Sequence, residues 1–121
     1  SLQELKKIKK MFPSKCRLLL SYHENHVVGG SFLIFVNQRV CLVFYNVIDE
    51  IYRGTQLSVY QLYRCMKEAL DEGCSLIDFG VSQTPEGNNP LAPKFSLIKF
   101  KEQFGANGII RTVYKKNYYY E

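Results

Sequence analysis

Three runs of strand-forming residues, which follow one another with little chain between them, constrain this sequence more than any other feature. The runs cover residues 16–22, 27–36 and 39–45, and the polar pairs Glu24-Asn25 and Asn37-Gln38 mark the breaks between them. Aliphatic and aromatic residues dominate each run, as is typical of half-buried strands. Connections this short join antiparallel neighbours. The sequence therefore predicts an antiparallel meander.

Two adjacent glycines, Gly29 and Gly30, lie inside the second run. Glycine weakens a strand unless the backbone needs the room, so the pair predicts a β-bulge or a close approach of another backbone.

A helix and a further strand are expected after the meander. Residues 58–72 show helical spacing of apolar residues up to Gly73, and Ser58 with Gln61 predicts a capping box at the start. The predicted inward face of this helix is Val59, Leu62, Tyr63, Met66, Ala69 and Leu70. Residues 75–81 are so densely apolar that they predict a strand buried on both faces. A strand that follows a crossover helix is expected to be parallel to its neighbour.

The rest of the chain predicts a loop, a helix and a last strand. Three prolines fall in residues 82–93, Leu97, Phe100 and Phe104 resume helical spacing before Gly105, and residues 109–114 are strand-like. A short amphipathic helix is expected before Pro13. The fold class is therefore α/β (α+β): a mixed sheet with helices on both faces, built from a meander, a helix, a parallel strand, a helix and a final strand.

Length and composition predict one domain that spans residues 1–121, because 121 residues with 46% hydrophobic content suit a single core. The longest apolar stretch, residues 40–45, is far too short to cross a bilayer, and no apolar leader opens the chain, so we expect a cytoplasmic protein. The four cysteines form no C-x-x-C pair, which predicts reduced, buried thiols. The net charge of +5 is concentrated near the start of the chain and predicts a solvated helix face rather than a nucleic-acid site.

Two motifs in the second half resemble a known family. Ile77-Asp78-Phe79-Gly80 is followed by a Gly/Asn/Pro loop and then by Phe100-Lys101-x-x-Phe104-Gly105. This order is similar to the D-F-G and F-K-x-x-F-G motifs of Fem-type and polysaccharide-biosynthesis acyltransferase domains of the GNAT superfamily. The resemblance covers roughly residues 16–115, with the glycine pair and the main helix in the corresponding order. Leu91 stands where the family has a G-L pair, but no glycine precedes it.

The resemblance implies a sheet that splays between its middle strands, where the acyl donor enters. It implies acetyl-CoA or another acyl donor, with aminoacyl-tRNA as the donor of the Fem branch. The family also has a first strand and helices ahead of the meander, so the chain is expected to lack the first strand and part of the N-terminal helices. In members that use coenzyme A, an R/Q-x-x-G-x-G/A loop receives the pyrophosphate; here only Arg53 and Gly54 match it.

Several side chains are candidates for the site, each with a structural alternative. Lys101 borders an apolar helix face, so it either holds an anionic group or a reacting carbonyl, or packs its stem with the ammonium in solvent. Asp78 is expected to be a buried carboxylate, either a base or a structural acceptor for loop backbone. Glu50 is a second candidate base, with a solvated loop residue as its alternative. Ser82 either donates a hydrogen bond to the donor or caps a turn.

No metal site is predicted. His23 and His26 flank a short turn, but no third ligand has matching spacing, so a hairpin end is expected.

Two functions follow from the resemblance. The first is transfer of an acyl or aminoacyl group to a small-molecule amine acceptor, such as a cell-envelope precursor or sugar. The second is a non-catalytic GNAT-like module that mediates protein association. A homo-oligomer is left open.

Overall fold

A computed structural model of the chain describes residues 1–83, 89, 91–110, 112 and 114–118. It comprises two compact units, Ser1–Gly80 and Val81–Glu121.

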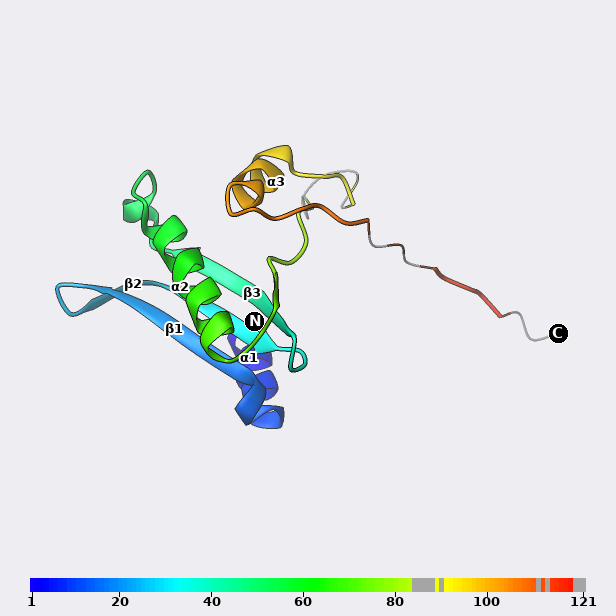
Figure 1. The fold of residues 1–121 in the computed structure, drawn as a ribbon, viewed down its shortest axis with the longest axis horizontal. Helices are drawn as coiled ribbons and strands as arrows, with labels where there is room; N and C mark the ends of the chain where they lie inside the picture. The colour runs from blue at the N-terminus through cyan, green and yellow to red at the C-terminus, as the bar shows by residue number, and fades with distance from the viewer. Residues whose placement is uncertain (84–88, 90, 111, 113, 119–121) are drawn as a thin grey trace. The chain divides into compact units, whose positions relative to one another are not determined.

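The first unit is a four-stranded mixed sheet with helices (Figure 1). Its elements in chain order are α1 (Leu2–Met11), η1 (Pro13–Lys15), β1 (Cys16–His23), β2 (His26–Phe35), β3 (Val40–Ile48), η2 (Glu50–Tyr52), α2 (Leu57–Asp71) and β4 (Leu76–Asp78). The sheet order is β1-β2-β3-β4; the first three strands are antiparallel, and β4 is parallel to β3. The predicted meander, crossover helix and parallel strand are confirmed.

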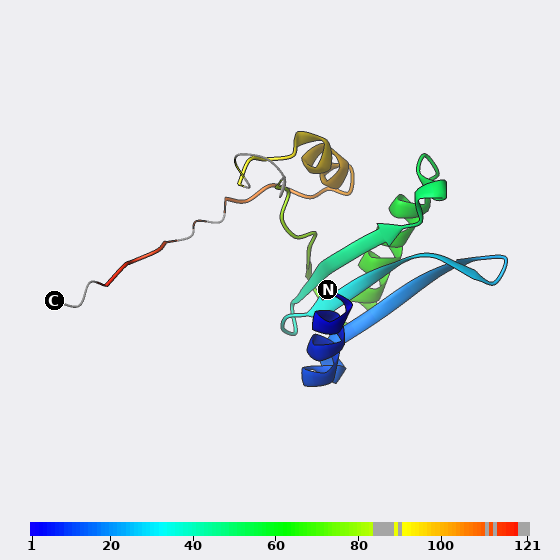
Figure 2. The ribbon, with the colours of Figure 1, turned by 180° about the vertical axis from the view of Figure 1, so that it is seen from behind.

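Helices lie on opposite sides of this sheet. Helix α2 lies across the front face in Figure 1, and α1 comes to the front when the molecule is seen from behind in Figure 2. Helix α1 is tied to the sheet by Lys9, whose ammonium donates to the carbonyl oxygen of Cys16 at 2.9 Å. Among the described residues, no helix is long and apolar enough to cross a membrane.

Two β-bulges interrupt the meander. Ser21 pairs with Gly29 but Tyr22 pairs with Val27, so Val28 is an extra residue in β2, directly before the glycine pair. A bulge was predicted at this place and is confirmed. The second bulge, in β3, was not predicted.

The core lies between the sheet and α2. It includes Leu33, Cys41, Val43, Leu62, Cys65 and Ala69. All four cysteines are buried and free, as predicted. Burial raises the pKa of Cys41 from 9.0 to about 12 and raises that of Cys65, so these thiols remain protonated and unreactive at neutral pH.

The outer edge of α2 is held to β1 by ion pairs. The guanidinium of Arg17 contacts the carboxylate of Glu68 and donates to that of Glu72 at 2.6 Å. The hydrogen bond to Glu72 raises the pKa of Arg17.

The predicted start of the main helix is wrong. Helix α2 begins at Leu57 with Gln56 at the N-cap, and Ser58 and Gln61 form no capping box. The hydroxyl of Thr55 accepts the N–H of Leu57 at 3.2 Å, which fixes the start one residue earlier. The buried face is also rotated: Gln61 and Cys65 are buried, whereas Leu70 is 68% exposed.

The strand predicted for residues 75–81 is shorter and more exposed than expected. Strand β4 covers Leu76–Asp78, and Leu76 is 57% exposed. In the described part of the chain, β4 is an edge strand that pairs only with β3, so density of apolar residues did not indicate burial on both faces.

The second unit contains helix α3 (Phe95–Glu102). The rings of Phe100 and Phe104 meet edge-on with centroids 5.4 Å apart. Gln83 and Pro93 form an isolated antiparallel bridge, which closes the segment predicted to be a loop; residues 84–88 and 90 lie outside the described residues. The final strand predicted for residues 109–114 is not present at its described positions, and residues 111 and 113 lie outside them.

Candidate active site

The candidate site begins at the point where β4 ends and β3 continues without it. Strand β4 pairs only with Val40, Cys41 and Leu42, although β3 continues to Ile48. From Val43 onward, no described residue extends the ladder on this side of β3. A strand edge of this kind presents backbone N–H and C=O groups that a ligand can use.

A bulge lies at the same point of β3. Phe32 pairs with Tyr45 but Leu33 pairs with Val43, so Phe44 is an extra residue without a partner in β2. Backbone N–H groups that are free of the ladder can stabilise a carbonyl oxygen that gains negative charge. The edge of β3 around Phe44 is therefore the candidate position for an acyl carbonyl.

The first turn of α2 lies just after β3 in the chain. Gln56 makes no side-chain cap, and the N–H of Tyr60 is the first to bond within the helix, to Gln56 at 2.9 Å. Within the described residues, the N–H groups of Ser58 and Val59 have no hydrogen-bond acceptor. Free amides at the start of a 15-residue helix favour an anionic ligand such as a diphosphate.

Arg53 and Gly54 precede this turn. Gly54 has φ +86°, a conformation that L side chains rarely adopt, and a Cβ added there would meet nothing within 4 Å. The guanidinium of Arg53 lies 3.2 Å from the carboxylate of Glu50, and the two side chains are 75% and 80% exposed. Glu50 is thus a solvated residue that pairs with the cation next to the helix start.

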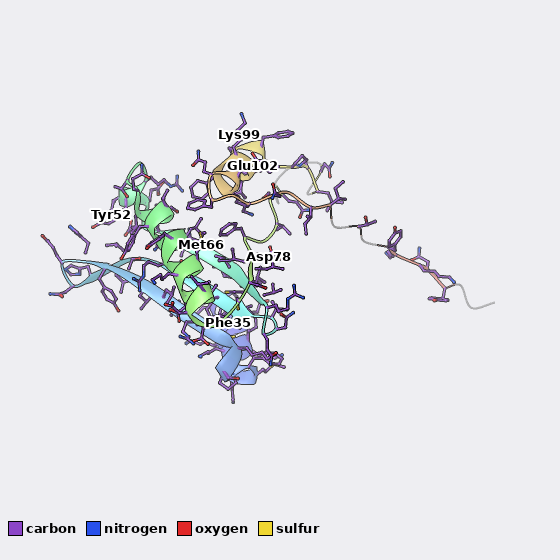
Figure 3. The ribbon with its side chains drawn as sticks, in the orientation of Figure 1. Phe35, Tyr52, Met66, Asp78, Lys99 and Glu102 are labelled. Carbon is purple, nitrogen blue, oxygen red and sulfur yellow. The ribbon has the colours of Figure 1, made fainter. Side chains whose placement is uncertain are left out.

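Asp78 is exposed rather than buried, which corrects the sequence prediction. Its carboxylate accepts the N–H of Gly80 at 2.7 Å, so it supports the turn that follows β4. This bond is of the kind expected from the predicted alternative, a structural acceptor for loop backbone. In Figure 3, Asp78 is well separated from Tyr52, which lies toward the start of α2.

Asp78 and Glu50 are not brought together. Asp78 pairs with Leu42 near the start of β3, and Glu50 follows the end of that strand. Six strand residues, 43–48, lie between Leu42 and the end of β3, which is roughly 20 Å at the rise of a β-strand.

Lys101 and Ser82 meet within the second unit. The ammonium of Lys101 donates to the carbonyl oxygen of Val81 at 2.8 Å and to the hydroxyl of Ser82 at 2.9 Å. Lys101 is half-buried, as predicted from the helix wheel. These two bonds fix α3 to the beginning of the segment that the Gln83–Pro93 bridge closes.

The histidine pair is a hairpin end. Glu24 and Asn25 between the histidines have positive φ values of 46° and 67°, which suits a two-residue turn. The Nδ1 atom of His23 lies 3.1 Å from the hydroxyl of Tyr52. The described part of the chain contains no group of His, Cys, Asp and Glu side chains that could hold a metal ion.

Polar residues under α2 were not predicted as part of the site. Gln61 was assigned to a cap, but its side chain lies against β2, and Asn46 reaches the first turn of α2. The glycine pair was the available signal, since a strand makes such room only for something that approaches its backbone closely.

A scan against protein-family models identifies residues 8–90 as an acetyltransferase (GNAT) domain. This match covers more than half of the chain, so the chain belongs to the GNAT acetyltransferase family. No curated protein sequence matches it.

Solved acetyltransferases share the fold. A Trypanosoma brucei acetyltransferase is 20% identical, and the match covers 97% of this chain and 80% of that one with a TM-score of 0.62. A GNAT family acetyltransferase from Elizabethkingia anophelis, solved with acetyl-CoA bound, is 12% identical over 82% of this chain and 59% of its own, with a TM-score of 0.61. AAC(6')-Iy, solved with the bisubstrate analogue CoA-S-monomethyl-acetylneamine, is 10% identical over 96% and 79%, with a TM-score of 0.67.

Proposed function

We propose that this GNAT domain transfers an acyl group from an acyl-coenzyme A donor to an amine acceptor. The observation that carries the proposal is the coincidence of three features: the end of the β4 ladder at Leu42, the bulge at Phe44, and the free N–H groups in the first turn of α2. The family and the donors bound by two of the solved neighbours support the same reading.

The residues at the helix start fit the anionic end of such a donor. The free N–H groups of Ser58 and Val59 would bind the diphosphate, and the open space at Gly54 lets a ligand approach the backbone. Arg53 would add a cation, although Glu50 now occupies it. When bound, acyl-coenzyme A supplies an activated thioester carbonyl.

This chain would contribute mainly orientation and backbone hydrogen bonds. The edge of β3 near Phe44 would orient the carbonyl and stabilise its oxyanion while the acceptor nitrogen attacks. The amine must lose a proton, and Glu50 remains our candidate acceptor for it, since its carboxylate is exposed. We propose that Asp78 shapes the turn after β4, and that Lys101 and Ser82 hold an anionic group of a substrate or the segment beside it.

We also propose a Fem-type relationship, with a cell-envelope precursor or sugar as the amine acceptor and aminoacyl-tRNA as an alternative donor. The D-F-G and F-K-x-x-F-G motifs support this proposal. We further propose that the two units act together as one acyltransferase domain.

Calorimetry with acetyl-CoA tests the proposal. Because only Arg53 and Gly54 match the family loop, we expect a dissociation constant in the upper micromolar range, about 5 to 6 kcal/mol of binding free energy. Release of free coenzyme A in the presence of a panel of amines would then demonstrate transfer.

Two variants sharpen the test. Glu50→Gln frees Arg53, so donor affinity should rise a few-fold, while the turnover rate falls if Glu50 accepts the amine proton. Arg53→Ala should weaken the donor by a similar factor, because the side chain is exposed and its charge is screened. A dissociation constant that neither variant changes would remove this end of α2 from the donor site.

The pairing of Arg53 with Glu50 favours a second candidate function, a non-catalytic GNAT-like module that mediates association. Absence of acetyl-CoA binding at millimolar concentration, in the unaltered chain and in Glu50→Gln, would support that module instead.

A further inference from the structure

A row of polar side chains runs between the sheet and the first turns of α2. Gln61 and Ser31 are only 3% and 1% exposed. The side-chain amide of Gln61 has its oxygen toward the strand. The oxygen accepts hydrogen bonds from the N–H of Gly30 at 2.8 Å and from the hydroxyl of Ser21 at 3.0 Å. The nitrogen donates to Oδ1 of Asn46 at 2.8 Å. Buried polar groups of this kind hold neighbouring elements in one arrangement.

Asn46 extends the row to the start of α2. Its Oδ1 also accepts from the hydroxyl of Ser31 at 2.8 Å, and its Nδ2 lies 3.4 Å from both the carbonyl oxygen and the hydroxyl of Ser58. Ser58 belongs to the turn whose N–H groups are the candidate anion site. One side chain therefore connects β2, β3 and the beginning of α2.

The bulge in β3 turns Asn46 toward the helix. Cys41 and Val43 are buried on the α2 side, and strict alternation would place Tyr45 next on that side. The extra residue Phe44 shifts the alternation by one, so that Asn46 pairs with Ser31 and faces α2. The bulge that lies at the free strand edge thus also brings the amide to the helix.

The absence of a side chain at Gly29 leaves room for the Gln61 amide against the strand. A Cβ at Gly29 would lie 2.4 Å from the Gln61 amide and 2.8 Å from the carbonyl oxygen of Val47. No side chain fits between the strand and the glutamine.

We infer that Asn46 and Gln61 are positioning residues, which hold the first turn of α2 in register with the edge of β3. Neither side chain need touch the donor. They set the separation between the amides that would bind the diphosphate and the strand edge that would hold the acyl carbonyl, and such separations control productive binding. The inference rests on the proposed function, because it assumes that both ends bind one donor.

Variants of similar side-chain volume test the inference in the full chain. Asn46→Leu and Gln61→Met remove the hydrogen bonds, and each should raise the dissociation constant for acetyl-CoA at least tenfold. Leu62→Ala is the matched control, since Leu62 is buried on the same helix but belongs to no hydrogen bond of the row. It should lower the melting temperature and leave donor affinity unchanged well below that temperature. Ser58→Ala is a milder variant in case the others do not fold, and it should weaken the donor about threefold.

Amide hydrogen exchange provides a readout that needs no ligand. The N–H of Tyr60 donates to Gln56 in the first helical bond, so its exchange should accelerate in Asn46→Leu and Gln61→Met but not in Leu62→Ala. Faster exchange with unchanged donor affinity overturns the inference. Equal loss of affinity in Leu62→Ala also overturns it, because general destabilisation would then be the cause. If the unaltered chain binds no acyl-coenzyme A, the proposed function fails first, and that result is visible before any variant is made.

Discussion

Gly29→Ala is the substitution whose effect the structure predicts most directly. The added Cβ would lie 2.4 Å from the Gln61 amide, 2.8 Å from the carbonyl oxygen of Val47 and 3.2 Å from the Cα of Ile48. Separations below 3.0 Å are not tolerated, and the carbonyl oxygen belongs to backbone that the sheet holds in place. Either β2 must move away from β3, or Gln61 must leave its site and its buried partners.

The loss of stability in Gly29→Ala follows from two costs, overpacking and the loss of a buried hydrogen-bond partner. Overpacking of a well-packed site costs about 1–3 kcal/mol. A buried donor or acceptor that loses its partner costs about 1–3 kcal/mol. We therefore expect Gly29→Ala to lower the free energy of unfolding by about 3 kcal/mol. With a urea dependence of about 1–3 kcal/mol per molar, the unfolding midpoint should fall by roughly 1–3 M.

Urea unfolding followed by circular dichroism measures this difference. Gly108→Ala is the control, because a Cβ there meets nothing within 4 Å and Gly108 has no positive φ. The double variant Gly29→Ala, Gln61→Ala removes the shorter contact but keeps the one to Val47. Its loss in the free energy of unfolding should therefore be smaller than the sum of the losses in the two single variants, but the contact to Val47 should still cost stability. If Gly29→Ala unfolds at the same urea concentration as Gly108→Ala, the close approach of Gln61 to β2 is wrong.

Three further predictions concern other parts of the chain. The pKa of Cys41 is raised from 9.0 to about 12 in the folded state, so ionisation favours the unfolded chain and stability should fall as pH rises from 9 to 12; Cys41→Ala should show a shallower fall in the same urea titrations. Lys101→Met removes two hydrogen bonds within the second unit and should lower its stability by about 1 kcal/mol, whereas Lys99→Met, on the exposed side of α3, should not; equal melting temperatures would contradict this. Arg17→Met removes both ion pairs to α2 and should cost about 1 kcal/mol at low salt but less at 1 M salt; a loss that salt does not change would contradict an electrostatic cause.

Period-two patterns made the sheet predictable, because alternation and short turns are local properties of the chain. The meander and its glycine pair were read correctly for that reason. The burial of β4 was predicted wrongly, because the apolar residues Leu76 and Ile77 do not reveal whether a second strand lies beside β4.

The face of α2 shows a different limit. Gln61 was counted as polar and placed at a cap, and Leu70 was counted as core, yet their burial is reversed. The reason is that the surface of the sheet under α2 is itself polar at Ser21 and Ser31, while Arg17 draws the acidic side of the helix toward β1. A helix wheel cannot include the chemistry of the surface on which the helix packs.

The candidate site was predictable only in part. Ser82 and Lys101 do meet, and Arg53 and Gly54 do precede the helix start, but Asp78 is exposed. The bulge at Phe44 has no sequence signal of its own, since it depends on how β2 and β3 align.

Because Phe44 is an extra residue, the alternation of side chains between the two faces of the sheet shifts by one residue within β3. Before it, odd-numbered residues such as Val43 face α2; after it, even-numbered residues such as Asn46 do. Deletion of this single residue would remove the bulge and still leave Asn46 facing the helix, because Tyr45 alone would then separate it from Val43. A homologue with a one-residue gap here would therefore keep the same residue under α2 but lose the bulge at the strand edge.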